Sequence, residues 1–425
     1  MRSADLLAIA VDIGTTTLCA SLVNRMTGER IAFAGRANPQ REFGDDVLSR
    51  LQAACASEEN HRKMHERIST ALEEMVDELL DGANADPHNV ESIALAGNPA
   101  MEHLFLGLPV QSLTFLPFRP LFSEGRRVRT SRLGWRRDLE AYLFPLPGGF
   151  VGGDLVAFLH GCKDSDSDHS SLITHHSLFL DLGTNGEIAL SSGGKFLATS
   201  AAAGPAFEGG NLSCGMPALA GAIDRVDLSG GTVAFSTIGG TPPVGICGSG
   251  VLEAVSAMLR TGILDRTGRI RPPGEIDSNL GNRVVKTDGA LSFVLYRDAS
   301  RTVQLSQEDI RQVQLAKAAV RAGMEVLFDH AGISAKEVQQ VILTGSFGAV
   351  LSPEWLKNVG IFSENMVHSA FFMGEGALVG AERALCEPAG FAAVDELARR
   401  IRVIPLSGTP TFEKSFLEQL NFPQP

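Results

Sequence analysis

The sequence contains no apolar run that could cross a membrane. Its longest runs, such as Leu6 to Val11 and Leu178 to Leu180, fall far short of the ~18 to 20 residues that a membrane helix needs. The start also lacks the basic region, apolar stretch and small-residue cleavage site that are typical of a signal peptide. These features predict a cytoplasmic protein that does not bind membranes.

The sequence also lacks cysteines at close spacing. Zinc and iron-sulfur sites usually draw their ligands from cysteines a few residues apart, whereas here the six are scattered: Cys19, Cys55, Cys162, Cys214, Cys247 and Cys386. We therefore expect reduced thiols and find no iron-sulfur cluster motif in this chain. A cluster assembled from cysteines far apart in the sequence stays open as the alternative.

Basic residues are fewer than acidic ones. The chain has 37 Lys and Arg against 49 Asp and Glu, which gives a net charge of −12. Because an acidic protein repels polyanions, this balance opposes binding to nucleic acid and to anionic membranes. A small phosphate ligand remains compatible, since backbone amides can bind it locally.

The length predicts more than one hydrophobic core. A single core stops growing near ~250 to 300 residues, and this chain has 425 residues, of which 44% are hydrophobic. A unit of strand, acid-x-Gly-Thr turn and returning strand occurs twice, at Leu6 to Val23 and at Leu178 to Leu190. The two turns begin at Asp12 and Asp181, 169 residues apart, which indicates two related lobes.

Helical patterns alternate with these strands. Apolar residues recur at steps of three and four from Met64 to Leu79, from Val251 to Leu259 and, after a capping pattern of Ser306 with Asp309, from Ile310 to Leu327. This alternation indicates an α/β fold. We expect a first lobe, a polar interlobe loop, a second lobe and a C-terminal tail at residues 1–165, 166–177, 178–388 and 389–425, respectively.

The polar stretch from Lys163 to His176, rich in Asp, Ser and His, indicates a solvated loop between the lobes. Its histidines leave a metal site open as an alternative. In the C-terminal tail, Phe412 and Phe416 lie four residues apart and are expected to anchor the tail on the second lobe.

The turn DIGTTT at 12–17 places a carboxylate at the end of a buried strand, followed by Gly14 and the hydroxyls of Thr15, Thr16 and Thr17. Such a turn suits a phosphate. It is not a P-loop, because a β-hairpin follows and no Gly-Lys-Ser/Thr is present. Asp12 would hold Mg²⁺ through water, although an ordinary hairpin turn is the alternative.

The second turn, DLGTNGE at 181–187, repeats this chemistry. Asp181 would be the second carboxylate that holds Mg²⁺ through water, and phosphate binding is expected from Gly183, Thr184, Asn185, Gly186 and Glu187. Two such turns facing each other would clamp phosphate groups from opposite sides. Their recurrence with matching strands argues against coincidence.

A third segment follows a strand at Val341 to Leu343: Thr344, then Gly345, Ser346, Phe347 and Gly348. Glycines here would let the backbone approach a flat adenosine. In this order the three segments resemble the phosphate-1, phosphate-2 and adenosine motifs of the superfamily of sugar kinases, heat-shock chaperones and actin. The resemblance implies an α/β, actin-like ATPase (ribonuclease H-like) fold with two related lobes around a nucleotide cleft.

Two acids compete as the catalytic base. Asp154 follows Gly152 and Gly153 at a position where this superfamily often orients the attacking water, and simple N-capping is the alternative. Glu208, in AAGPAFEGG at 202–210, is the competitor, although that segment could also be a structural turn. Gly204, Gly248 and Ser249 are further candidates for nucleotide binding. Small residues should let the helix after Gly152 cross closely over the one at Gly374 to Ala381.

Longer stretches resemble the C-terminal ATPase region of the reductive activators of corrinoid enzymes: NPQ at 38–40, GDDVLSR at 44–50, AGNPAMEHLFLGL at 96–108, GFVGGD at 149–154, CGM at 214–216, GICGSG at 245–250 and QEDIRQVQLAKAAVRAG at 307–323. The resemblance runs from about residue 8 to the final Asn-Phe-Pro. It implies a homodimer that couples ATP hydrolysis to reduction of Co(II) to Co(I) in a corrinoid protein partner.

The sequence departs from that family in two ways. The nucleotide fold is expected to begin almost at Met1, without the ferredoxin-like domain usual in that family, so we expect either that a separate iron-sulfur protein supplies electrons or that the biological role has changed. Pro99 and Ala100 stand where the family has Thr or similar small polar residues. Two other hypotheses are a kinase for a small hydroxylated substrate and a nucleotide-dependent scaffold or assembly protein.

Overall fold

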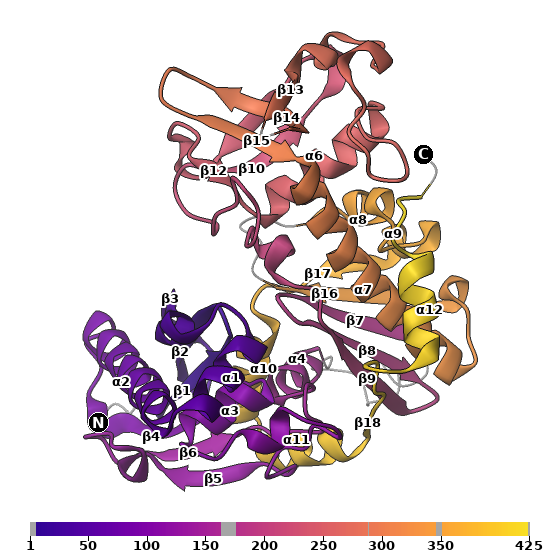
Figure 1. The fold of residues 1–425 in the computed structure, drawn as a ribbon. Helices are drawn as coiled ribbons and strands as arrows, with labels where there is room; N and C mark the ends of the chain where they lie inside the picture. Colours follow the sequence, from indigo (N-terminus) through magenta and orange to yellow (C-terminus); the bar gives the residue numbers. More distant parts are fainter. Residues whose placement is uncertain (1–5, 163–175, 288, 346–350, 424–425) are drawn as a thin grey trace. The chain divides into compact units, whose positions relative to one another are not determined.

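The structure is a computed structural model that describes residues 6–162, 176–287, 289–345 and 351–423. It divides into two compact units (Figure 1). The first comprises residues 1–172, 195–198 and 375–403, and the second comprises residues 173–194, 199–374 and 404–425. The two units are described separately below.

The first unit is built on a six-stranded sheet of order β3-β2-β1-β4-β6-β5. Its strands are β1 (Leu7–Ile13), β2 (Thr17–Asn24), β3 (Arg30–Ala37), β4 (Val90–Gly97), β5 (Arg126–Arg129) and β6 (Glu140–Leu143). Its helices are α1 (Val47–Ala56), α2 (Glu58–Gly82), α3 (Pro99–Phe105), α4 (Gly153–Gly161), α10 (Gly376–Cys386) and α11 (Gly390–Arg399), and β18 (Ile401–Val403) also groups with this unit.

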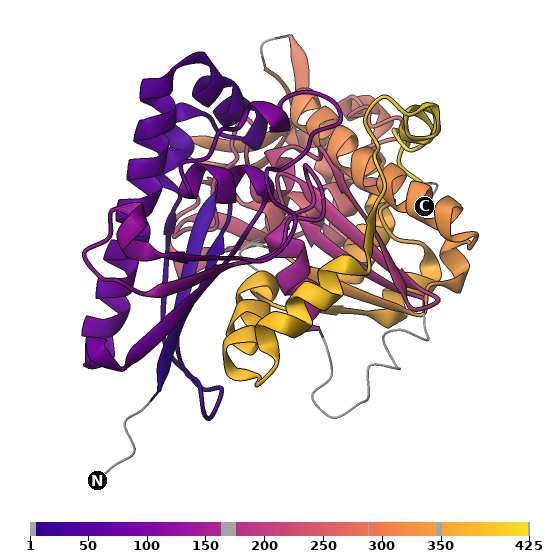
Figure 2. The same ribbon diagram turned by 90° about the horizontal axis from the view of Figure 1, so that it is seen from below.

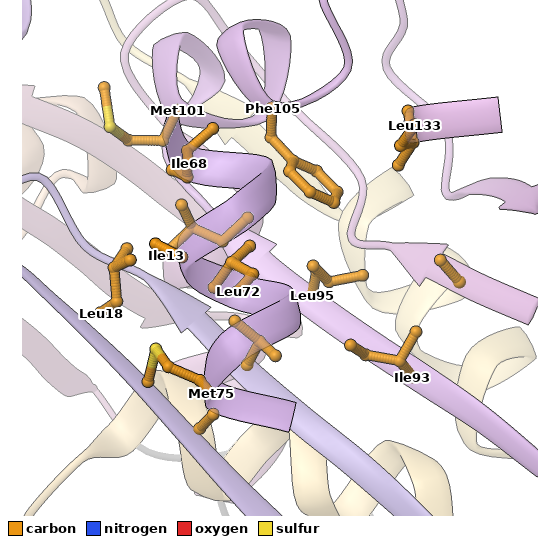
Figure 3. Close-up of a cluster of buried hydrophobic side chains, with 14 of the residues drawn as sticks. Ile13, Leu18, Ile68, Leu72, Met75, Ile93, Leu95, Met101, Phe105 and Leu133 are labelled. Carbon is orange, nitrogen blue, oxygen red and sulfur yellow. The ribbon is translucent and has the colours of Figure 1, made fainter. Parts of the chain in front are cut away.

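The two faces of this sheet differ in side-chain size. Large residues of β1 and β4, such as Ile13 and Leu95, join the hydrophobic core under α2, and Figure 3 shows Leu72 of that helix among them. The alternate positions are alanines, as at Ala10 and Ala94, because successive strand residues point to opposite faces. This small-residue face lets α10 pack against β1 and β4, and Figure 2 shows the gold helices α10 and α11 on the opposite side of the first strands from α2.

Helix α10 also crosses α4 at close range, as the glycines in both helices predict. A Cβ at Gly380 would overlap the carbonyl oxygen of Ala157, and a Cβ at Gly161 would lie 3.0 Å from the backbone nitrogen of Gly380. This packing explains why the expected boundaries at 178–388 and 389–425 are wrong: residues 375–403 group with the first unit, because α10 finds its complementary small-residue surface there.

A second six-stranded sheet has the order β17-β16-β7-β8-β9-β18, of which β18 and residues 195–198 of β9 group with the first unit. The second unit contains the rest of this sheet and two small three-stranded sheets. Its strands are β7 (Ser177–Leu182), β8 (Gly186–Ser192), β9 (Lys195–Ala201), β10 (Ala222–Asp227), β11 (Ala234–Thr237), β12 (Gly245–Ile246), β13 (Val284–Thr287), β14 (Ala290–Arg297), β15 (Thr302–Ser306), β16 (Gln340–Thr344) and β17 (Ala370–Phe372). Its helices are α6 (Gly248–Arg260), α7 (Gln307–Ala331), α8 (Pro353–Val359), α9 (Glu364–Ser369) and α12 (Pro410–Glu418).

The repeat seen in the sequence is confirmed by strand pairing. In the first unit β1 pairs antiparallel with β2 and parallel with β4. In the second unit β7 pairs antiparallel with β8 and parallel with β16. Asp12 and Asp181 therefore occupy equivalent places, each on a central strand next to a hairpin.

The C-terminus is held by α7. The predicted capping box of Ser306 with Asp309 begins this helix, and two of its buried polar residues bind the end of the chain. Lys317 donates to the carbonyl oxygen of Asn421 at 2.5 Å, and Gln314 donates to that of Leu420 at 2.9 Å. The Lys317 ammonium also lies 5.4 Å from the ring centre of Phe422. Because Lys317 is buried, its pKa is lowered to about 8.

The anchor of the tail is Phe422, which is 1% exposed. Phe412 and Phe416, the expected anchors, are only partly buried, because α12 lies on the outer side of α7 and their rings partly cover each other at 6.0 Å. Residues 389–403 of the expected tail group with the first unit and residues 404–425 with the second.

We expect Phe422→Ala to lower the free energy of unfolding by about 3 to 5 kcal/mol, since it removes a buried ring and leaves a cavity beside Lys317. Leu417→Ala, at an exposed position on α12, is the matched control and should change it by less than about 0.5 kcal/mol. Urea unfolding followed by circular dichroism measures both. Equal effects of the two substitutions would contradict the assigned anchor.

Candidate functional site

The first candidate turn joins β1 to β2 through Gly14, Thr15 and Thr16. A Cβ at Gly14 would overlap the carbonyl oxygen of Thr17, so the turn is tight enough to require glycine. Asp12 lies one residue before the end of β1, opposite Cys19 on one side and Ala96 on the other. Asp12 and the three threonines are partly exposed, while the rest of β1 is buried.

Two buried asparagines hold this turn. The Asn38 side chain donates to the carbonyl oxygen of Gly14 at 2.9 Å, and its backbone N–H donates to Thr16 at 2.9 Å. The Asn98 side chain donates to the Thr15 hydroxyl at 2.9 Å. Sequence reasoning used the segments of both residues only for resemblance and missed this role. An Asn before a Pro, at 38–39 and 98–99, is a helix-start signal that pointed to structural importance.

Asn98 also fixes the start of α3, because its side-chain oxygen accepts from the backbone N–H of Met101 at 3.1 Å. Pro99 occupies the first turn of that helix, where a missing N–H costs nothing. The departure from the family at Pro99 and Ala100 therefore leaves the helix start intact, and the Asn98 side chain still reaches Thr15.

Asp154 lies in the first turn of α4, near the same end of the sheet. A Cβ at Gly152 would lie 2.5 Å from the Asn98 Cα, so glycine allows α4 to begin against the turn after β4. The N-cap of α4 is Gly152, and the N-cap alternative for Asp154 is therefore wrong. One oxygen of Asp154 accepts from the Leu155 N–H at 2.8 Å.

Glu102 is a second carboxyl at this place, and sequence reasoning missed it. It is fully buried on α3, and Oε1 accepts from the Gly97 N–H at 3.2 Å. Its Oε2 is buried without a hydrogen-bond partner in the part of the chain that the structure describes. Burial, and then the charge of Asp154, raise the pKa of Glu102 well above its usual range.

The two carboxyls differ in burial. Burial raises the pKa of Asp154 to about 6, but Asp154 keeps partial contact with solvent. Glu102 has none, and its burial favours the neutral form of the carboxyl. A carboxylate with a pKa near 6 suits a general base.

The second candidate turn joins β7 to β8 through Gly183, Thr184 and Asn185. Asp181 lies opposite Glu187 on β8 and Thr344 on β16. Asp181, Gly183 and Asn185 are partly exposed. The expected phosphate ligands Gly186 and Glu187 belong to β8 and are buried.

Glu208 is brought to this turn by the short helix Pro205–Glu208. Its carboxylate accepts a hydrogen bond from the Thr184 hydroxyl, and the Gly204 N–H donates to the carbonyl oxygen of Thr184 at 2.9 Å. Gly204 has φ 76°, a backbone conformation that favours glycine. The segment at 202–210 is therefore a structural turn, and it also places the Glu208 carboxylate beside the second candidate turn.

The remaining candidates have different placements. A Cβ at Gly248 would overlap the carbonyl oxygen of Phe207, so α6 begins directly against the Glu208 segment. The Ser249 hydroxyl is buried and donates to the backbone carbonyl oxygen of Asp224 at 3.2 Å. This contact indicates a structural role for Ser249. Gly345 follows β16 with φ 131°. Ser346, Phe347 and Gly348 lie outside the described residues, as do His169 and His175.

The residues of each turn fit a magnesium-bound phosphate. Each turn contains a glycine, at least one side-chain hydroxyl and one partly exposed aspartate. Hard oxygen ligands, often through water, are what Mg²⁺ takes, and backbone amides are what phosphate oxygens take. In the described ranges, no group of three or more His, Cys, Asp or Glu has the geometry of a metal site.

Two further features bear on membranes and thiols. None of the described helices is long and apolar enough to cross a membrane. Burial raises the pKa of the Cys19 thiol to about 12. A thiol with so high a pKa is a poor nucleophile and a poor metal ligand.

Comparison with known proteins connects this geometry to a family. The model of the C-terminal domain of RACo, the ASKHA domain, matches residues 175–425, and that of the RACo middle region matches residues 7–164. The chain is 29% identical over 422 residues to the corrinoid activation enzyme RamQ of Eubacterium limosum, a match that covers 97% of this chain and 70% of RamQ.

Two further relatives agree. The Co(II) methylated amine-specific corrinoid protein reductase of Methanosarcina barkeri is 24% identical over 457 residues, which covers 97% of this chain and 76% of the reductase. A solved structure of a reductive activator for corrinoid, iron-sulfur protein superposes on this chain with a TM-score of 0.87 at 29% sequence identity. The match covers 100% of this chain and 67% of the activator's chain. Since the ASKHA model alone spans more than half of the chain and the middle-region model most of the remainder, this protein belongs to the RACo family and has the actin-like ATPase fold of its ASKHA domain.

Proposed function

We propose that this protein hydrolyses ATP and couples it to the reductive activation of a corrinoid protein, Co(II) being reduced to Co(I). The observation that carries the proposal is the match to corrinoid activation enzymes along nearly the whole chain. Each Co(II) centre would take one electron from a separate iron-sulfur protein, whose cluster is oxidised by one electron. We further propose that the protein is a homodimer, as the family resemblance implies.

The chain's own residues would supply binding, orientation and a proton acceptor. Amides and hydroxyls of the turns after Asp12 and Asp181 would bind phosphate oxygens, and the two carboxylates would hold Mg²⁺ through water. When bound, Mg²⁺ supplies positive charge that offsets the charge of the phosphates. Asn38 and Asn98 keep the first turn in place, so that positioning costs little at the moment of reaction.

Asp154 is our choice for the residue that orients water and accepts its proton. Its raised pKa and partial exposure support this role. Glu208 is already engaged by the Thr184 hydroxyl, which supports a role in fixing the second turn. Glu102 is buried beside the start of α4. In its neutral form it would exclude water from the buried side of Asp154.

Substitution of the two turn carboxylates tests the ATP site. We expect Asp12→Asn and Asp181→Asn each to lower ATP hydrolysis by about 10- to 100-fold, as loss of a residue that holds a metal through water usually does. Both should also raise the Mg²⁺ concentration needed for half-maximal rate. The matched control Asp86→Asn changes an exposed aspartate and should have no effect. If either variant keeps the wild-type rate of ATP hydrolysis, the turn that carries the substituted aspartate is not part of the ATP site.

The base is tested by pH dependence. Because the pKa of Asp154 is raised to about 6 and the base must be ionised, ATP hydrolysis should fall as the pH drops through 6, about tenfold per unit below it. Asp154→Asn should lower kcat by about 10²- to 10⁴-fold with nucleotide affinity retained. Glu208→Gln should lose far less, since an amide oxygen still accepts from Thr184. The reverse ranking would make Glu208 the base.

The redox role is tested with purified corrinoid proteins in the Co(II) state. We expect one of them to stimulate ATP hydrolysis, and Co(I) to form, measured by its absorbance, only when ATP and a reduced [2Fe-2S] protein are both present. Replacement of ATP by a non-hydrolysable analogue is the control. ATP hydrolysis without stimulation and without Co(I) would leave an ATPase and refute the activator role.

A further inference from the structure

The segment between α3 and β5, residues 106–125, exposes several large apolar side chains. We call it the apolar loop. Phe115 is 59% exposed, Leu116 68% and Leu121 53%. Single exposed apolar residues are ordinary, but several gathered on one short segment mark an interaction surface.

The same part of the sequence is rich in arginine, although the whole chain carries a net charge of −12. Residues 106–137 contain seven arginines and one acid, Glu124. Among the described residues, ion pairs engage Arg127, Arg129, Arg136 and Arg137 but none of Arg119, Arg126 and Arg132. Arg126 lies over the Phe122 ring at 5.5 Å. An apolar centre with an arginine rim is typical of a protein-binding surface.

The apolar loop is joined to the first candidate turn through α3. The backbone N–H of Leu121 donates to His103 at 3.0 Å, and the Phe122 ring stacks on His103 at 5.5 Å. His103 is fully buried on α3. The first residue before that helix is Asn98, whose side chain binds the Thr15 hydroxyl.

A second contact joins the apolar loop to the segment that leads into α4. The rings of Phe118 and Phe150 lie 5.0 Å apart, and a Cβ at Gly149 would overlap the carbonyl oxygen of Phe118. Phe150 precedes Asp154 by four residues. A movement of the apolar loop would therefore act on both ends of the candidate site in this unit, at Thr15 and at Asp154.

We propose that the apolar loop, with Arg119 and Arg126 at its rim, is the docking surface for the corrinoid protein. The proposal rests on the proposed function and specifies the partner's chemistry: an exposed apolar patch bordered by carboxylates. The arginines complement such a border, whereas the acidic remainder of the chain would repel it. Docking of the partner is thereby linked to the residues that hold the phosphate turn and the base.

The central test is the double variant Phe115→Ser/Leu116→Ser. It should bind the Co(II) corrinoid protein at least about tenfold more weakly, because central apolar anchors dominate such interfaces. Its ATP hydrolysis without partner should equal that of wild type, since neither residue belongs to the ATP site. The matched control is Leu219→Ser/Val244→Ser, two residues 62% and 54% exposed in the second unit, which should bind like wild type.

The arginine rim is tested separately. Arg119→Gln/Arg126→Gln should slow association with the corrinoid protein and flatten its dependence on salt, while dissociation changes little. Calorimetry and stopped-flow measurements on the full chain, with folding of each variant checked by thermal unfolding, provide these values.

The outcomes separate this proposal from the function on which it rests. If wild type and the apolar-loop variant bind the corrinoid protein equally, the docking surface is refuted and the activator function stands. If wild type binds none of the purified corrinoid proteins, both are refuted. If light scattering shows that the variant loses a dimer yet still binds the partner, the apolar loop joins two copies of this chain and the docking proposal is overturned.

Discussion

The interaction on which the rest of the first unit depends is the hydrogen bonding of two buried asparagines to a turn that only glycine can form. A tight turn at the end of a buried strand leaves carbonyl and hydroxyl groups without strand partners, and such groups are costly if unpaired. Asn38 and Asn98, from two segments further along the chain, satisfy them. Because Asn98 also begins α3, the geometry of the turn is fixed by the same residue that fixes the helix.

The alanine face of the first sheet has a consequence far along the chain. Small side chains on β1 and β4 admit α10, and α10 in turn holds α4 through contacts at glycine. Close packing of this kind tolerates little change in volume. The position of Asp154, at the start of α4, therefore depends on alanines and glycines that take no part in chemistry.

The sequence was sufficient to predict the repeat, the main strands and helices, and the two acid-Gly-Thr turns, because these follow from local periodicity and turn chemistry. It was not sufficient for the grouping of residues 375–403, which depends on which surface α10 fits. It also missed Glu102, Asn38 and Asn98. Each acts through contacts with residues distant in the sequence, such as Asn38 with Gly14, and no local pattern states such a pairing.

The pair of Glu102 and Asp154 shows how an unfavourable burial can be useful. Two ionised carboxylates beside each other in a buried place would repel strongly, so one must keep its proton. Full burial favours the neutral form of Glu102, whereas the pKa of the partly exposed Asp154 is raised only to about 6. The raised pKa of Glu102 means that the native state binds more protons than the unfolded chain above the usual pKa of a glutamate. Folding stability from this residue therefore falls as the pH rises from there. The burial of Glu102 beside Asp154 thus costs some folding stability as the pH rises.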